Sequence, residues 1–321
     1  MKEIKTEKGR LTLVIPVLNE ERAIPLFVKE TEKVRRQENL NIEYLFVDDG
    51  STDGTLALLK KLSAASKAIH YLSFSRNFGK EAAIYAGLQH ASGELVAVMD
   101  VDLQDPPSLL PDMIRAVVEE GYDCVGTRRV SRKGEPKLRS FCARCFYRLI
   151  NRMSRTEIVD GARDYQLMNR KVVSAILSMG EYNRFSKGIF GWVGYRKKWL
   201  EYENVERSAG ETKWSFWKLF AYALDGITAF STAPLVFASV LGVIFCLAAF
   251  VMILVIVIKT LAFGDPTSGW PSMVCILLLV SGVQLFCIGI LGQYLAKTYL
   301  ETKRRPIYLI EEAELGDDET K

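Results

Sequence analysis

Histidine is scarce in this chain, which has only His70 and His90 among its 321 residues. Both lie far from the acidic clusters of the sequence, so neither a Ser-His-Asp arrangement nor a histidine-based metal site is indicated. The sequence also lacks Gly-x-Gly-x-x-Gly and Gly-x-x-x-x-Gly-Lys-Ser/Thr. Those loops hold phosphates in dinucleotide-binding and P-loop domains, and their absence argues against both classes.

The cysteines argue against a fold stabilised by disulfides or zinc, and the net charge argues against a nucleic-acid-binding protein. Cys246, Cys275 and Cys287 lie in apolar runs, and the pair Cys142 and Cys145 has no second pair with which to complete a zinc site. The six cysteines therefore form no recognisable disulfide framework. The formal net charge is only +4, so a nucleic-acid partner is not indicated.

Charge is missing altogether from two long segments, Leu235–Ile258 and Trp270–Ala296. Each exceeds the roughly 20 apolar residues that a helix needs to cross a bilayer. The alternative of two buried core helices fits less well, because such helices are shorter and carry a polar stripe. We therefore expect a transmembrane hairpin with spans at about 235–258 and 271–296.

The flanking charges predict the orientation of this hairpin. Lys297, Lys303 and Arg304 follow the second span, whereas the short connection carries Lys259 balanced by Asp265. The positive-inside rule then places the long N-terminal part and the C-terminal tail in the cytoplasm, as expected for a multi-pass protein of the bacterial inner membrane. No apolar leader precedes Leu11, which agrees with this orientation.

The first part of the chain alternates short apolar runs with amphipathic segments of helical length. This β-α alternation predicts an α/β domain with a mostly parallel sheet covered by helices on both faces. The expected strands are Leu11–Pro16, Tyr44–Val47, Ile69–Ser73, Leu95–Met99 and Cys124–Gly126, and the expected helices are Ala23–Arg36, Thr55–Ser66, Lys80–Ala91 and Leu109–Glu120.

Acidic residues follow two of the expected strands directly. Asp48 and Asp49 end one apolar run, and Asp100 and Asp102 end another. Open α/β sheets bind ligands at the carboxyl ends of their strands, and paired carboxylates suit a hard cation that bridges to phosphates. A single Asp-x-Asp is weak evidence, but polar clusters after five strands together predict a binding site at this edge.

These clusters, in order, resemble glycosyltransferase family 2, and in particular its membrane-bound polyprenyl-phosphate glycosyltransferases. The resemblance implies a GT-A catalytic fold and covers most of the chain, including the terminal hairpin. It is carried by Pro16…Asn19-Glu20, Asp48-Asp49-Gly50-Ser51, Arg76-Asn77-x-Gly79-Lys80, Asp100-x-Asp102-x-Gln104-Asp105-Pro106-Pro107 and Gly126-Thr127-Arg128.

The resemblance also implies roles for individual residues. Asp100, Asp102 and Gln104 would hold Mg²⁺ or Mn²⁺ against the diphosphate of a nucleotide sugar, which stabilises the leaving group. Lys80 and Arg128 would contact the donor phosphate or sugar, with a solvated surface as the alternative for both. The residues expected around the nucleotide are Pro16, Asn19, Glu20, Asp48, Asp49 and Asp100.

The acceptor side follows from the same resemblance. Asp164 occupies the place of a catalytic acidic residue, either as a base or to orient the acceptor, and Arg163 stands where the family often has Gly. Arg163, Arg207 and Lys213 would bind the lipid phosphate, with a solvated loop as the alternative for Arg207 and Lys213. An acceptor that is a phosphate monoester is already mostly ionised at neutral pH, so it has little need of a base.

The remaining segments complete the expected domain organisation. A basic amphipathic helix at 137–153 would lie in the lipid headgroup layer or, alternatively, pack as a core helix with a solvated basic face. We expect a cytoplasmic GT-A domain at 1–210, an aromatic interfacial helix at 211–230, the hairpin at 231–300 and an acidic-ended tail at 301–321, with self-association of the hairpin left open.

The function expected from the resemblance is transfer of a sugar, from UDP-glucose or UDP-N-acetylglucosamine, to undecaprenyl phosphate at the cytoplasmic face with inversion. Alternatives are a GDP-mannose-dependent mannosyltransferase, a processive polysaccharide synthase and a non-catalytic membrane scaffold. A synthase fits less well because Gln-x-x-Arg-Trp is absent from the sequence. A scaffold would not need acidic residues at the strand ends.

Overall fold

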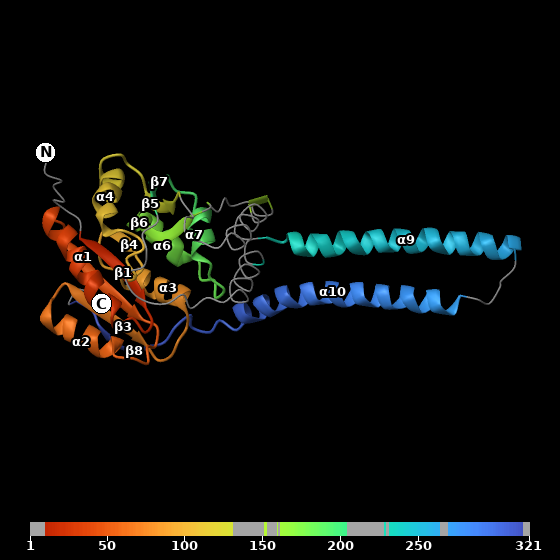
Figure 1. The fold of residues 1–321 in the computed structure, drawn as a ribbon, viewed down its shortest axis with the longest axis horizontal. Coiled ribbons are helices and arrows are strands. Elements are labelled where there is room, and N and C mark those ends of the chain that lie inside the picture. Colours follow the sequence, from red (N-terminus) through yellow and green to blue (C-terminus); the bar gives the residue numbers. More distant parts are fainter. Residues whose placement is uncertain are drawn as a thin grey trace.

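The computed structural model describes residues 10–130, 151–152, 159, 161–203, 228, 231–263 and 269–316. They form an α/β domain and a hairpin of two long helices that extends away from it (Figure 1). The strands of the domain join in one sheet of order β7-β5-β6-β4-β1-β2-β3-β8. Their bounds are β1 (Leu11–Val17), β2 (Ile42–Asp48), β3 (Ile69–Phe74), β4 (Leu95–Val98), β5 (Cys124–Arg129), β6 (Ala162–Asn169), β7 (Lys197–Tyr202) and β8 (Ile310–Glu314).

Helices cover both faces of this sheet, as the alternating sequence pattern predicted. Phe27 of α1, Leu59 of α2 and Met113 of α4 belong to the core on one face, whereas Leu88 of α3 and Val172 of α6 belong to the core on the other. The helices of the domain are α1 (Ala23–Gln37), α2 (Thr55–Ala65), α3 (Lys80–His90), α4 (Leu110–Val118), which follows a short 3₁₀ turn (Pro107–Leu109), α6 (Arg170–Ser178) and α7 (Ser186–Trp192).

The parallel part of the sheet confirms the predicted α/β class. β4, β1, β2 and β3 are parallel neighbours, and each predicted strand and helix of this part lies within a few residues of its observed bounds. The sheet is nevertheless mixed, because β6 runs antiparallel between β4 and β5 and β8 runs antiparallel beside β3. The sequence pattern predicted neither antiparallel strand.

The order of the parallel strands reverses at β1. The chain passes from β1 to β2 and β3 on one side, and then places β4 on the other side of β1. Ligands of open α/β sheets bind at such a reversal, outside the carboxyl ends of the strands. Gly87 allows α3 to lie against β1 beneath this edge, because a Cβ there would come within 2.1 Å of the Val14 side chain.

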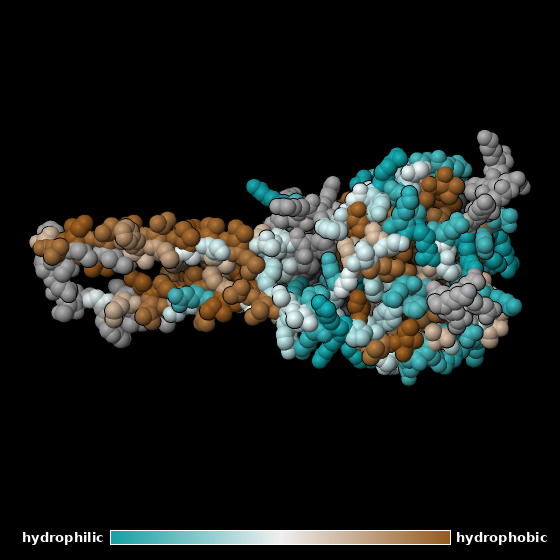
Figure 2. All heavy atoms as spheres, turned by 180° about the vertical axis from the view of Figure 1, so that it is seen from behind, coloured by the Kyte–Doolittle hydropathy of each residue, from teal (hydrophilic) through white to brown (hydrophobic). Residues whose placement is uncertain are grey.

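The hairpin consists of α9 (Ala233–Phe263) and α10 (Trp270–Thr302). On the face that Figure 2 shows, the described residues of the hairpin are mostly apolar, in contrast to the mixed surface of the α/β domain. Both helices are long and apolar enough to cross a bilayer, and their most apolar stretches bury no residue inside the protein. Leu247 and Leu285, for example, are 62% and 70% exposed. The helices of a buried core do not expose apolar side chains along their length, so α9 and α10 are candidate membrane spans.

The chain after α10 returns to the α/β domain. β8 pairs with β3, and the backbone N–H of Ser75 donates to the Leu309 carbonyl at 3.1 Å. Lys60 of α2 forms an ion pair with Glu312 of β8 at 2.6 Å. The segment that follows the hairpin is therefore part of the same α/β domain that precedes it.

Tyr308 anchors the segment after α10 to the α/β domain. We predict that Tyr308→Ala lowers the free energy of unfolding by about 2 kcal/mol. Its ring stacks on Phe74 at 5.0 Å between centroids, and its hydroxyl lies 3.1 Å from His90 Nε2 and 3.0 Å from Gln89 Oε1. Thermal unfolding in detergent should show a drop of roughly 4–8 °C. Tyr195→Ala, at an exposed tyrosine, is the matched control, and an equal drop in both variants would contradict the prediction.

Candidate active site

The loops that follow β1 and β2 are joined by side-chain hydrogen bonds at the predicted nucleotide edge. The Thr52 N–H donates to Asn19 Oδ1 at 2.8 Å, and the Asn19 N–H donates to Ser51 Oγ at 2.9 Å. Asn19 has a φ of +55°, a conformation that asparagine tolerates better than most residues. The Glu20 N–H donates to Thr55 Oγ1 at 2.9 Å. These contacts give the expected nucleotide-binding loops a defined shape.

The two adjacent aspartates after β2 have different surroundings. Asp48 is buried, and its two oxygens accept from the Ser51 N–H at 3.1 Å and from Ser73 Oγ at 2.9 Å. Asp49 is also buried, and it accepts from the N–H groups of Phe78 and Gly79. Burial raises the pKa of Asp49 although these two donors act against the rise. Both aspartates thus organise the loops of this edge.

Gly50 makes the contact between these loops possible. Its φ is +70°, and a Cβ at this position would lie 2.6 Å from the carbonyl carbon of Arg76. Only glycine combines this conformation with such a close approach. The loop after β2 therefore packs directly on the loop that leads into α3.

Lys80, Asp100 and Asp164 form an ion cluster at the carboxyl edge of the sheet. Lys80 Nζ lies 2.7 Å from Asp100 Oδ1 and 2.6 Å from Asp164 Oδ2. Three elements bring these residues together, because Lys80 begins α3, Asp100 follows β4 and Asp164 lies on β6. The antiparallel register of β4 with β6 pairs Val98 with Gln166, which sets Asp164 opposite Asp100.

The cluster keeps its members ionised. Burial favours the neutral form of Asp164, but the ammonium of Lys80 and the charge of Lys187 outweigh it and hold the pKa of Asp164 well below its usual range. Likewise, desolvation acts against the charged form of Lys80, but Asp100 and Asp164 raise the pKa of this lysine above its usual value. An acid with so low a pKa is a poor proton acceptor, so Asp164 is better suited to electrostatic work than to general-base catalysis.

The loop after β4 carries the candidate metal ligands. The Gln104 N–H donates to Asp102 Oδ1 at 3.1 Å, and Leu103 between them has a φ of +56°. Within the described part of the chain, no three His, Cys, Asp or Glu side chains form a complete metal site. Mg²⁺ needs only one or two carboxylates when substrate phosphates supply further ligands. The oxygen donors of Asp100, Asp102 and Gln104 therefore fit Mg²⁺ or Mn²⁺.

Arg163 is tied to this same loop. Its Nε donates to Asp105 Oδ1 at 2.9 Å and its Nη2 donates to Gln104 Oε1 at 3.2 Å. Asp105 is fully buried and also accepts a hydrogen bond from the Tyr202 hydroxyl. Burial opposes the charge of Arg163, but Asp105 reverses the effect and raises the pKa of the guanidinium.

The other predicted site residues have varied placements. Pro16 lies near the carboxyl end of β1, and Arg128 on β5 donates from Nε to Glu201 of β7 at 2.9 Å across an exposed strand pair. Arg207, Lys213 and the interfacial helix, except residue 228, lie outside the described residues. Of the amphipathic helix at 137–153, only residues 151–152 are described, and both are helical.

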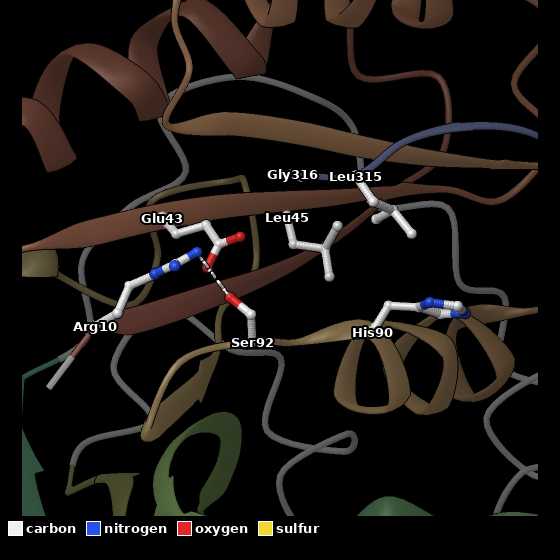
Figure 3. A pocket seen from close by; sticks show the side chains of 7 residues that line it. All are labelled: Arg10, Glu43, Leu45, His90, Ser92, Leu315 and Gly316. Carbon is white, nitrogen blue, oxygen red and sulfur yellow. Dashed lines mark hydrogen bonds and ion pairs between the residues drawn. The ribbon is translucent and has the colours of Figure 1, made fainter. Parts of the chain in front are cut away.

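A recess lies at the amino-terminal edge of the sheet, opposite the edge that carries the candidate active site (Figure 3). Glu43 on its wall accepts from Thr12 Oγ1 at 3.1 Å and from Ser92 Oγ at 2.5 Å. Leu315 and Gly316 of the C-terminal segment close one side. Its polar groups hydrogen-bond to one another, so the recess is part of the scaffold, and the carboxyl edge remains the candidate active site.

The sequence reasoning missed two residues that contribute to the site. Asp105 was recognised only as part of a motif, and Tyr202 lies on a strand that the pattern did not predict. The signal for Asp105 was an acidic residue directly before Pro106 and Pro107, next to the expected ligands. The sequence provided no comparable signal for Tyr202, because its contact with Asp105 depends on β7 lying beside β5.

The acid-rich carboxyl edge and the mixed α/β sheet agree with what the comparison with known families shows. The profile of Glycosyl transferase family 2 matches residues 12–177. The chain belongs to this family and is a glycosyltransferase with a GT-A-like catalytic domain followed by two candidate membrane helices.

Relatives resemble the chain over nearly its whole length. A bactoprenol glucosyl transferase of Shigella phage SfX is 42% identical over 301 residues, which cover 94% of this chain and 98% of the relative. A prophage bactoprenol glucosyl transferase homolog of Escherichia coli (strain K12) is 40% identical over 301 residues, with the same coverage of both proteins. Among solved structures, a glucosyl-3-phosphoglycerate synthase from Mycobacterium tuberculosis is 19% identical, with a TM-score of 0.48 over 70% of this chain and 80% of that one.

The contacts of Lys80 in the ion cluster predict that Lys80→Met destabilises the protein by an amount that depends on pH. We expect a loss of stability on the order of 1 kcal/mol at pH 7, less than for a fully buried pair because the lysine side chain is 41% exposed. Because the pKa of Asp164 is lower in the folded protein than in the unfolded chain, ionised Asp164 stabilises the fold at pH values above about 4. This stabilisation is lost as the pH falls through the pKa that Asp164 has in the folded protein. In the variant Asp164 takes up a proton at a higher pH.

The difference in stability between wild type and Lys80→Met should therefore shrink as the pH falls from 7 toward 3. Thermal unfolding in detergent at each pH measures it. Lys171→Met, at an exposed position of α6, is the matched control and should show no such trend. A difference that is the same at every pH would mean that Lys80 does not stabilise ionised Asp164.

Proposed function

We propose that this chain transfers a hexose from a nucleotide-sugar donor, UDP-glucose before UDP-N-acetylglucosamine, to undecaprenyl phosphate at the cytoplasmic face of the bacterial membrane. The observation that carries the proposal is the combination of an acid-rich carboxyl edge with an apolar helical hairpin whose ends both join the same domain. The names of the relatives support bactoprenol, a polyprenyl lipid, as the acceptor class.

The donor would lie across the carboxyl edge. The loops at Asn19 and Asp48 would hold the nucleoside, and Asp100, Asp102 and Gln104 would hold Mg²⁺ or Mn²⁺ beside the diphosphate. The bound cation would offset the charge that builds on the diphosphate as the anomeric bond breaks. Lys80 is placed to contribute in the same way, because its ammonium already lies at the metal-site carboxylate Asp100.

The acceptor would attack without prior deprotonation. A phosphate monoester carries between one and two negative charges at neutral pH, so a phosphate oxygen of the lipid already has the lone pair it needs. As this oxygen bonds to the anomeric carbon, the bond to the donor diphosphate breaks and the nucleoside diphosphate leaves, which inverts the configuration. The lowered pKa of Asp164 supports a role in stabilising positive charge on the sugar. Arg207 and Lys213 would bind the lipid phosphate.

A transfer assay tests the function. Purified protein in detergent is incubated with undecaprenyl phosphate, Mg²⁺ or Mn²⁺, and radiolabelled UDP-glucose, UDP-N-acetylglucosamine or GDP-mannose in turn. We expect label in the lipid fraction with a UDP-sugar and none without the lipid phosphate. Labelling with GDP-mannose alone would make the chain a mannosyltransferase, and no labelling with any donor would contradict the proposal.

Asp102→Asn tests the metal assignment within this assay. The change removes one negative charge from the cation site but keeps the shape and one oxygen acceptor of the side chain. We expect transfer to fall by at least a hundredfold, with an unchanged thermal unfolding temperature. Asp112→Asn, at an exposed position in the first turn of α4, is the matched control. Undiminished transfer by Asp102→Asn would rule out this carboxylate as a metal ligand.

A further inference from the structure

Arg163 belongs to a buried polar cluster beside the candidate metal ligands. Asp105 is fully buried, and one of its oxygens accepts from both Arg163 Nε and the Tyr202 hydroxyl. The Arg163 side chain itself is only 17% exposed. Releasing Arg163 from this cluster would leave the carboxylate of Asp105 buried without its counter-charge, which is strongly unfavourable. The guanidinium is therefore held in place.

The same guanidinium fixes the side chain of a candidate ligand. Arg163 Nη2 donates to Gln104 Oε1 at 3.2 Å, while the Gln104 N–H donates to Asp102 Oδ1 at 3.1 Å. The intervening Leu103 has a φ of +56°, which is costly for this residue type and persists only where the surroundings enforce it. Arg163 and Asp105 supply such surroundings at one end of the loop.

Strand β6 carries both Arg163 and a member of the ion cluster, Asp164. Neighbouring residues of a strand point to opposite faces, and here Arg163 contacts Asp105 while Asp164 contacts Lys80. One short stretch of backbone therefore sets the position of both the metal loop and the ion cluster. Two hydrogen bonds to the loop after β4 and an exposure of only 17% tie Arg163 to the donor half of the site.

We propose that Arg163 is a positioning residue, which holds Asp102 and Gln104 in the conformation that binds the divalent cation, and is not a ligand of the lipid phosphate. The inference rests on the proposed function, because it assigns Arg163 to the donor half of the same site. The planar fork of arginine suits the task, as it donates to Asp105 and Gln104 at the same time. A lysine at this place offers a single ammonium and cannot reproduce both bonds in that geometry.

Arg163→Lys provides the main test, because it keeps the positive charge beside Asp105 and so preserves folding. Mn²⁺ binding to the protein with saturating UDP is measured by electron paramagnetic resonance, and the KM for undecaprenyl phosphate is measured in parallel. We expect the dissociation constant for Mn²⁺ to rise 10- to 100-fold, with no change in the KM for the lipid. Arg115→Lys, at an exposed arginine of α4 paired with Asp112, is the matched control and should bind Mn²⁺ as wild type does.

A second variant keeps the proposal testable if Arg163→Lys is unstable. Arg163→Gln combined with Asp105→Asn removes both charges, leaves no buried ion unpaired, and should also weaken Mn²⁺ binding. Unchanged Mn²⁺ binding in the folded variants, or a raised KM for the lipid phosphate alone, would overturn the positioning role. If the wild-type protein binds no Mn²⁺ with either UDP or GDP, the proposed donor site itself is contradicted. Failure of the positioning role can therefore be distinguished from failure of the proposed function.

Discussion

Burial of the central strands on both faces is the constraint on which the rest of this structure depends. β1 and β4 lie in the middle of the sheet with helices above and below, and nearly all their residues are buried. Such strands leave little room for polar chemistry along their length. Charged side chains are therefore concentrated where the strands end, and the order of the strands reverses beside β1.

The carboxyl edge of the sheet brings opposite charges together. Lys80 lies between Asp100 and Asp164, and Arg163 lies between Asp105 and Gln104. Each cation is partly desolvated, so its charge acts more strongly on its neighbours than it would in water. The pKa of Asp164 falls as a result. An ionised Asp164 fits the proposed attack by a phosphate that is already ionised, because that attack requires no proton removal.

The hairpin and the tail complete the architecture of the chain. α9 and α10 expose apolar side chains along their length, and β8 then joins the chain to the outer side of β3. The tail contributes a strand, a stacked tyrosine and an ion pair to the domain. The segment that follows the hairpin is therefore part of the same α/β domain that precedes it.

The sequence by itself determined the class of the protein, because local patterns carry that information. Apolar runs predicted β1 to β5 and α1 to α4, uncharged segments predicted the hairpin, and acidic residues after the strands indicated the edge of the candidate site. Only the tertiary structure decided the partners of individual residues. Arg163 was expected at the lipid phosphate but contacts Asp105, and Tyr202 had no predicted role. These contacts join residues 58 to 97 positions apart and depend on the antiparallel placement of β6 and on β7, which no local pattern specifies.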